Sequence, residues 1–131
     1  MTMREAVVAV LRRADGRLLM IERGPKARMA GYWGFPSGTV EPGEDQPETL
    51  VREMREELGV AVAPLRKVWQ CPADGVDYLL HWWTAEITEG VPAPDGAEVA
   101  EVRWVTAREF AKLSPTFPGD RPFFEDVLPT L

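Results

Sequence analysis

Three glutamates, Glu53, Glu56 and Glu57, stand close together in a segment with helical periodicity. At 3.6 residues per turn they share one helix face about 100° wide, beside an apolar face formed by Leu50, Val51, Met54 and Leu58. The like charges of Glu53 and Glu57 weaken an isolated helix by roughly a few tenths of a kcal/mol. Carboxylates gathered in this way can hold Mg²⁺ or Mn²⁺, which prefer oxygen ligands. An acidic stretch is more often a solvated helix face, so the flanking residues must decide between the two.

The spacing around the glutamates favours chemistry. Gly38 is followed after five residues by Glu44, and after seven more by the run Arg52-Glu53-Met54-Arg55-Glu56-Glu57-Leu58-Gly59-Val60. This arrangement resembles the complete motif of the Nudix hydrolase family, G-x5-E-x7-R-E-U-x-E-E-x-G-U, in which U is a bulky apolar residue. Every fixed position of the motif is occupied, and the chain is identified as a member of that family on this resemblance.

The resemblance implies an α/β fold, an α/β/α sandwich with a mixed β-sheet, in one domain over residues 1–131. It implies that Mg²⁺, or Mn²⁺ in its place, is bound by Glu53, Glu56, Glu57 and the carbonyl of Gly38. Glu53 and Glu56 are also expected to be catalytic, and Arg52 is expected to orient a carboxylate. Two further motif residues have expected structural roles: Glu44 supports the loop and the helix start, and Gly59 serves the turn.

The motif region departs from the family pattern at two positions. Ser37 stands where the family usually has a second glycine, which is acceptable if its φ angle is negative. Met54 stands where Leu, Ile or Val is more frequent, which changes packing only. We expect neither departure to remove the activity.

Resemblance to the MutT-like nucleoside triphosphate pyrophosphohydrolases extends beyond the motif. It implies that Arg23 faces the substrate, that Phe35 lines a base pocket, and that Asp120 hydrogen-bonds the base. The alternatives are a solvated strand end for Arg23, a core aromatic for Phe35 and a helix N-cap for Asp120. A further acid is expected in the loop before Trp104, as metal ligand or general base; Glu98 is preferred over Glu101, and both could be solvated loop acids.

The aromatic residues of the segment 76–87 leave a second substrate class open. Tyr78 and Trp82 point to one strand face and Trp83 to the other, where they form either core packing or a base-stacking surface. Tyr78 also lies where diadenosine polyphosphate hydrolases of the family have a characteristic tyrosine. ADP-ribose hydrolases rank third, because their usual proline is replaced here by the sequence Ala73-Asp74-Gly75. For His81 and Cys71 we expect structural roles.

These residues predict Mg²⁺-dependent hydrolysis of a nucleoside triphosphate to the monophosphate and pyrophosphate, with an oxidised purine nucleotide among the candidate substrates. The alternatives are a dinucleoside polyphosphate hydrolase and then an ADP-ribose pyrophosphatase. A catalytically silent nucleotide-binding regulatory domain is the non-enzyme alternative, although such domains generally lose motif glutamates. A purely structural acidic helix would show no Mg²⁺-dependent turnover.

Composition restricts the partners. The 131 residues suit one domain, and the net charge of −6 with no basic stripe argues against a nucleic-acid polymer as partner. No apolar run approaches the roughly 20 residues that span a bilayer, and residues 1–5 lack the features of an export signal. The single cysteine favours a reducing cytoplasm. We expect a small nucleotide as substrate, no membrane association, and a monomer or homodimer.

The elements that must position these residues follow from periodicity and turn residues. Strands are expected over 6–11 and 17–22, paired as a hairpin through Asp15-Gly16, and over 64–71, 76–87 and 99–105. The motif helix is expected to have Asp45 as N-cap, to form a capping box with Glu48 and to stop at Gly59. Irregular backbone is expected around Pro36 and Gly38. Helices are expected over 107–113 and 122–131.

Overall fold

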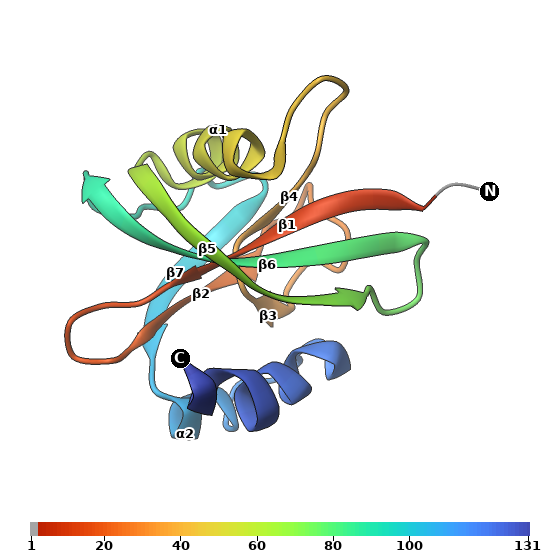
Figure 1. Ribbon diagram of the computed structural model, residues 1–131. Helices are drawn as coiled ribbons and strands as arrows, with labels where there is room; N and C mark the ends of the chain where they lie inside the picture. The colour runs from red at the N-terminus through yellow and green to blue at the C-terminus, as the bar shows by residue number, and fades with distance from the viewer. Residues whose placement is uncertain (1–2) are drawn as a thin grey trace.

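The first strand is buried on both faces, and this sets the layers of the fold. The structure, a computed structural model, describes residues 3–131. In β1 (Arg4–Leu11), Val7 and Ala9 point into one apolar cluster, whereas Val8 and Val10 point into a second. The helix α1 (Gln46–Leu58) covers the first cluster and the C-terminal helical segment covers the second, on the opposite side of the strands (Figure 1). The expected α/β/α sandwich is confirmed.

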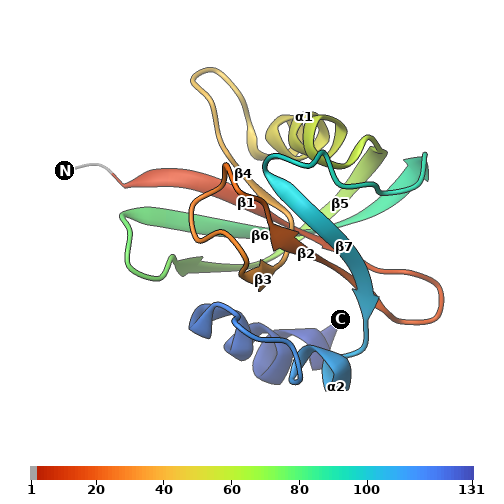
Figure 2. The same cartoon turned by 180° about the vertical axis from the view of Figure 1, so that it is seen from behind.

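The middle layer consists of two sheets. The first is mixed, with the order β4-β1-β6-β5, because β1 runs parallel to β6 and antiparallel to β4. The second is antiparallel, with the order β3-β2-β7, and faces the viewer in Figure 2. The remaining strands are β2 (Leu18–Arg23), β3 (Trp33–Gly34), β4 (Ser37–Thr39), β5 (Ala61–Pro72), β6 (Tyr78–Glu89) and β7 (Val99–Val105).

The predicted hairpin of the first two strands is wrong. A tight turn does form, with Gly16 at φ 87°, but Arg12 and Leu18 make a single bridge before the strands separate. Both edges of β1 are occupied by β4 and β6, and both edges of β2 by β3 and β7. Neither strand therefore has a free edge at which the other could pair with it.

The motif helix begins and ends as the sequence predicts. The Asp45 side chain accepts a hydrogen bond from the Glu48 amide at 2.8 Å, and the Glu48 side chain accepts one from the Asp45 amide at 3.1 Å. Gly59 ends the helix in the left-handed conformation, at φ 69°. Leu50, Met54 and Leu58 are buried against the sheets, which fixes the rotation of the helix and therefore the direction of its glutamates.

Other boundaries differ from the predictions. Ser37–Thr39 forms β4 where irregular backbone was expected. β5 extends beyond the predicted strand at both ends, whereas β6 begins and ends two residues later than predicted. The helix α2 (Ala107–Phe110) is shorter than predicted. The final helix predicted over 122–131 is instead a π-helical turn, η2 (Phe123–Val127), followed by a 3-10 turn, η3 (Leu128–Thr130); another 3-10 turn, η1 (Pro118–Asp120), precedes them. Its prolines lack the amide donor that regular helix needs.

Within residues 3–131, no helix is long and apolar enough to cross a membrane. Residues 1 and 2 belong to the segment in which no export signal was expected. They lie outside the described residues.

Candidate active site

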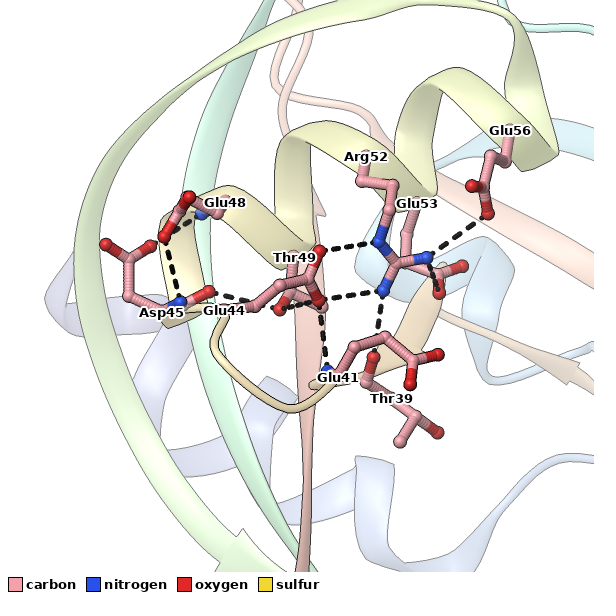
Figure 3. A network of polar contacts seen from close by, with 9 residues as sticks. All are labelled: Thr39, Glu41, Glu44, Asp45, Glu48, Thr49, Arg52, Glu53 and Glu56. Carbon is pink, nitrogen blue, oxygen red and sulfur yellow. Dashed lines mark hydrogen bonds and ion pairs between the residues drawn. The ribbon is translucent and has the colours of Figure 1, made fainter.

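Arg52 is the centre of a polar network on α1 (Figure 3). Its guanidinium forms two hydrogen bonds with the Glu44 carboxylate, at 2.6 and 2.9 Å. It also donates to Glu53 at 2.9 Å, to Glu56 at 3.2 Å and to the Thr39 carbonyl at 3.1 Å. Arg52 therefore ties the helix to the end of β4 and orients two motif glutamates, which is the role the resemblance implies.

Glu44 connects the loop before α1 to the helix itself. Besides Arg52, its carboxylate accepts hydrogen bonds from the Glu41 amide at 3.0 Å and from the Thr49 hydroxyl at 2.9 Å. Hydrogen bonding to Arg52 lowers the pKa of Glu44 to about 2, so this carboxylate is ionised at neutral pH. Its expected role in supporting the loop and the helix start agrees with these contacts.

Gly38 is in direct contact with Glu53. A Cβ atom built at Gly38 would lie 2.1 Å from Cγ and 2.7 Å from Oε1 of Glu53. The absence of a side chain at Gly38 lets the buried carboxyl group of Glu53 rest on the backbone of β4. This contact explains why the first position of the motif is a glycine. Ser37 beside it is not among the described residues with positive φ, so the serine is accommodated as expected.

Four acidic side chains gather where α1 meets the loop before β7. Burial raises the pKa of Glu57 to about 8, and the negative charges of Glu53, Glu98 and Asp95 contribute. Burial also raises the pKa of Glu53, against the opposing effect of Arg52. Full ionisation of the four acidic side chains is therefore unfavourable, and a bound cation would relieve the repulsion between their negative charges.

The donor set fits a hard divalent cation. Carboxylate oxygens of Glu53, Glu56 and Glu57 line one cavity together with the backbone of Gly38, and Mg²⁺ prefers such oxygens. Among residues 3–131, no three acidic, histidine or cysteine side chains already converge on one point as metal ligands. Glu53 and Glu56 are instead hydrogen-bonded to Arg52, so metal binding by all three glutamates requires side-chain rotation.

The loop before β7 brings Glu98, and not Glu101, to the cavity. Asp95 accepts hydrogen bonds from the amides of Ala97 and Val99 at 2.9 and 2.8 Å, and so shapes the loop. The Glu98 carbonyl accepts from the Gly24 amide at 2.8 Å. Glu98 lines the cavity, whereas Glu101 pairs with an arginine on the exposed side of β7.

The cavity has a volume of about 760 Å³, which is in the range of small-molecule sites. Arg23 lines it at the end of β2, donates to the Arg28 carbonyl and lies over the Phe117 ring at 5.8 Å. Burial lowers the pKa of Arg23, while Glu57 and Glu98 act in the opposite direction. Arg23 therefore lies between the acidic cluster and the aromatic part of the cavity.

Phe35 and Tyr78 line the cavity but are already engaged. Phe35 is buried and packs edge-on against Trp82 and Phe123, at 5.1 and 5.2 Å between ring centroids. The Tyr78 hydroxyl lies 3.2 Å from the Thr39 hydroxyl, and the Arg4 guanidinium covers its ring at 5.0 Å. Neither ring is a free stacking surface in this structure. Trp82 and Trp83 pack in opposite clusters, as the strand alternation predicts.

Asp120 is a buried acid in the aromatic part of the cavity, near Phe117. Only 9% of it is exposed, and no hydrogen bond reaches its carboxyl group from the described residues. Burial raises the pKa of Asp120 to about 7, and the charge of Asp74 contributes. The alternative role as an N-cap fails, because η2 starts after Pro122 and has no side-chain cap. Asp120 thus lines the cavity as a buried acid.

His81 and Cys71, for which structural roles were expected, differ in their position relative to the cavity. His81 is buried and its Nε2 lies 2.8 Å from Glu5, which suits a structural role. Cys71 accepts from the Trp82 indole at 3.4 Å and also lines the cavity. Sequence reasoning did not predict Arg4, Asp74, Asp95 or Phe117 as site residues, although they line the cavity. For Asp74 and Asp95, an Asp-Gly pair ahead of a strand was a usable local signal of a turn; Arg4 and Phe117 have none.

Comparison with known proteins agrees with the geometry. A model of the NUDIX domain matches residues 2–127. The chain is 35% identical over 127 residues to the CTP pyrophosphohydrolase of Escherichia coli (strain K12), across 95% of this chain and 91% of the relative. It is 32% identical over 119 residues to a putative 8-oxo-dGTP diphosphatase of Bacillus subtilis (strain 168), across 91% of this chain and 69% of the relative.

A solved structure shares the architecture closely. The MutT NUDIX hydrolase from Burkholderia pseudomallei superimposes with a TM-score of 0.82 at 27% identity, covering 95% of this chain and 97% of that one. Motif, fold and relatives agree that the chain belongs to the Nudix hydrolase family and is a pyrophosphohydrolase of nucleotide substrates.

Proposed function

We propose that this enzyme hydrolyses a nucleoside triphosphate to the nucleoside monophosphate and pyrophosphate, with Mg²⁺ as its cofactor. One observation carries the proposal: a single cavity joins the acidic cluster of α1, the cation Arg23 and the buried acid Asp120. A triphosphate nucleotide needs three such regions, which are a metal-binding region for phosphates, a cation for the phosphate chain and a polar group for the base.

The metal would be held by Glu53, Glu56 and Glu57, with the Gly38 carbonyl completing the set. A divalent cation supplies charge neutralisation for the phosphates and activation of a water. The protein's own contribution is positional. Arg52 holds Glu53 and Glu56 at the cavity wall, and Glu98 or a motif glutamate accepts the proton of the attacking water.

Arg23 is proposed to contact the phosphate chain. It is half-buried, which strengthens its interaction with an anion, and its guanidinium stays charged at neutral pH. Phe35 would contribute apolar wall rather than a stacking face, because its ring already packs against Trp82 and Phe123.

The ranking of the candidate substrates depends on which cavity side chains already have partners within the protein. Tyr78 motivated the dinucleoside polyphosphate alternative, but its hydroxyl and ring face are occupied by Thr39 and Arg4. A triphosphate therefore ranks first, and both the CTP and the 8-oxo-dGTP activities named for relatives lie within this class. A reducing cytoplasm remains the proposed compartment, since Cys71 is a free thiol.

A substrate panel with Mg²⁺ tests the proposal. Normal and oxidised nucleoside triphosphates, dinucleoside polyphosphates and ADP-ribose are incubated with the enzyme, and the products are separated by ion exchange. We expect the highest kcat/KM for a triphosphate, with monophosphate and pyrophosphate as products. Preferred turnover of a dinucleoside polyphosphate or of ADP-ribose, or release of inorganic phosphate from a triphosphate, would contradict it.

A further inference from the structure

Asp74 connects two segments across the cavity that are far apart in sequence. It lies in the turn between β5 and β6, and its carboxylate accepts a hydrogen bond from the Gly119 amide at 2.8 Å. A Cβ atom at Gly119 would lie 2.7 Å from the same carboxylate oxygen, so the contact requires glycine there. The turn is thereby fastened to the residue that precedes Asp120.

The carboxyl group of Asp120 is confined by this arrangement. It is nine-tenths buried, and its Oδ2 lies 3.5 Å from the position of a Cβ at Gly34. No hydrogen bond joins it to another described residue, and it lines the cavity. An unpaired buried acid is costly, so a ligand that supplies its hydrogen-bond partner gains affinity.

We propose that Asp74 is a positioning residue for base selection: by holding Gly119 and facing Asp120, it makes Asp120 select a base that presents a hydrogen-bond acceptor beside an amino group, as cytosine does. This inference rests on the proposed function, because it names the class of base taken by the same cavity. Asp74 itself does not contact the base; it acts through the position and charge state of Asp120.

The chemistry of the carboxyl group explains the preference. A neutral carboxylic acid has one donor and one acceptor, which match the cytosine N3 acceptor and its amino donor. An ionised carboxylate has acceptors only, which match the two neighbouring donors of guanine, N1–H and the amino group. Burial and the charge of Asp74 raise the pKa of Asp120 to about 7, so the neutral form is populated up to about pH 7.

Three titratable or charged groups approach this region from the surrounding elements. Asp74 comes from the β5–β6 turn, and Cys71 comes from β5 with its pKa raised by burial, so that its thiol is uncharged. Arg23 from β2 reaches the region over the Phe117 ring. Of these, Asp74 is the negative group that disfavours ionisation of Asp120.

Two substitutions at Asp74 separate the effect of its hydrogen bond with Gly119 from the effect of its negative charge. Asp74→Asn keeps an oxygen that can accept from the Gly119 amide but removes the negative charge, whereas Asp74→Ala removes both. Asp77→Asn is the matched control, since Asp77 is an exposed acid of the same turn that does not line the cavity. The measurements are kcat/KM for CTP and GTP, hydrogen exchange of the Gly119 amide, and the ¹³C NMR titration of the Asp120 carboxyl group.

We expect Asp74→Asn to lower the CTP-to-GTP ratio of kcat/KM by about tenfold at pH 7, the value of roughly one hydrogen bond to the base. The change should appear mainly in KM, and the titration midpoint of Asp120 should fall. The Gly119 amide should stay protected in Asp74→Asn and lose protection in Asp74→Ala.

An unchanged ratio and an unchanged Asp120 midpoint in Asp74→Asn would overturn the inference, as would the same change in Asp77→Asn. The two NMR measurements require no turnover. Failure of the proposed function, in which no triphosphate is hydrolysed, is therefore distinguishable from failure of this inference. If Asp74→Ala does not fold, Asp74→Asn and the control still decide.

Discussion

Gly38→Ala is the most specific perturbation that the structure offers. The new Cβ would lie 2.1 Å from Cγ of Glu53, whereas carbon atoms in contact are about 3.5–4.0 Å apart. The Glu53 side chain must therefore move by roughly 1.5 Å, because its neighbour is the backbone of β4. Misplacement of a catalytic group by about 1 Å can cost about a hundredfold in rate, which corresponds to about 2.7 kcal/mol of activation free energy.

The assay is Mg²⁺-dependent pyrophosphate release from a nucleoside triphosphate, with the melting temperature measured in parallel. We expect kcat to fall about a hundredfold while the fold persists, because Gly38 is not among the positive-φ glycines and the obstructing group is a flexible side chain. Gly24→Ala provides the contrast: its Cβ would lie 2.1 Å from the backbone oxygen of Ala97, so stability should fall first. Activity of Gly38→Ala within threefold of wild type, as a rough threshold for one lost contact, would refute the reasoning.

Three further changes follow from the site. Arg52→Lys cannot reproduce the paired hydrogen bonds to Glu44, so we expect kcat to fall about tenfold and the melting temperature to drop in calorimetry; equal values would count against the network. Glu98→Gln should lower kcat by orders of magnitude and Glu101→Gln should not, as steady-state kinetics would show; the reverse order would exchange their roles. The raised pKa of Asp120 destabilises the fold as pH rises from about 4 to 7, so Asp120→Asn should melt higher than wild type at pH 8 and equally at pH 4, and the absence of that difference would argue against a neutral buried acid.

The motif region was predictable because its information is local. Capping by Asp45, the stop at Gly59 and the apolar face ending at Leu58 depend on residues within one helix, so their spacing alone defines them. The position of Arg52 relative to Glu44 also follows from the motif. Contacts of this kind form between residues that the sequence already places close together.

The strand pairing and the base end of the cavity were not predictable in the same way. The turn at Gly16 resembles a hairpin, but which strands occupy the edges of β1 depends on β4 and β6, at long sequence distances. Asp74 and Asp120 meet only because the β5–β6 turn and the C-terminal segment fold to the same side. The Asp74-Gly75 pair indicates a turn, but no local pattern indicates that this turn contacts Gly119.

The central claim is that α1 carries a metal-dependent catalytic site, and it is tested most directly by two conservative substitutions. Glu53→Gln and Glu57→Gln keep side-chain size and remove the charge that binds a divalent cation. The measurement is kcat for Mg²⁺-dependent pyrophosphate release, with circular dichroism to confirm folding and the exposed Glu86→Gln on β6 as control. The account predicts a loss of orders of magnitude in both site variants and none in the control; wild-type turnover in both site variants would contradict it.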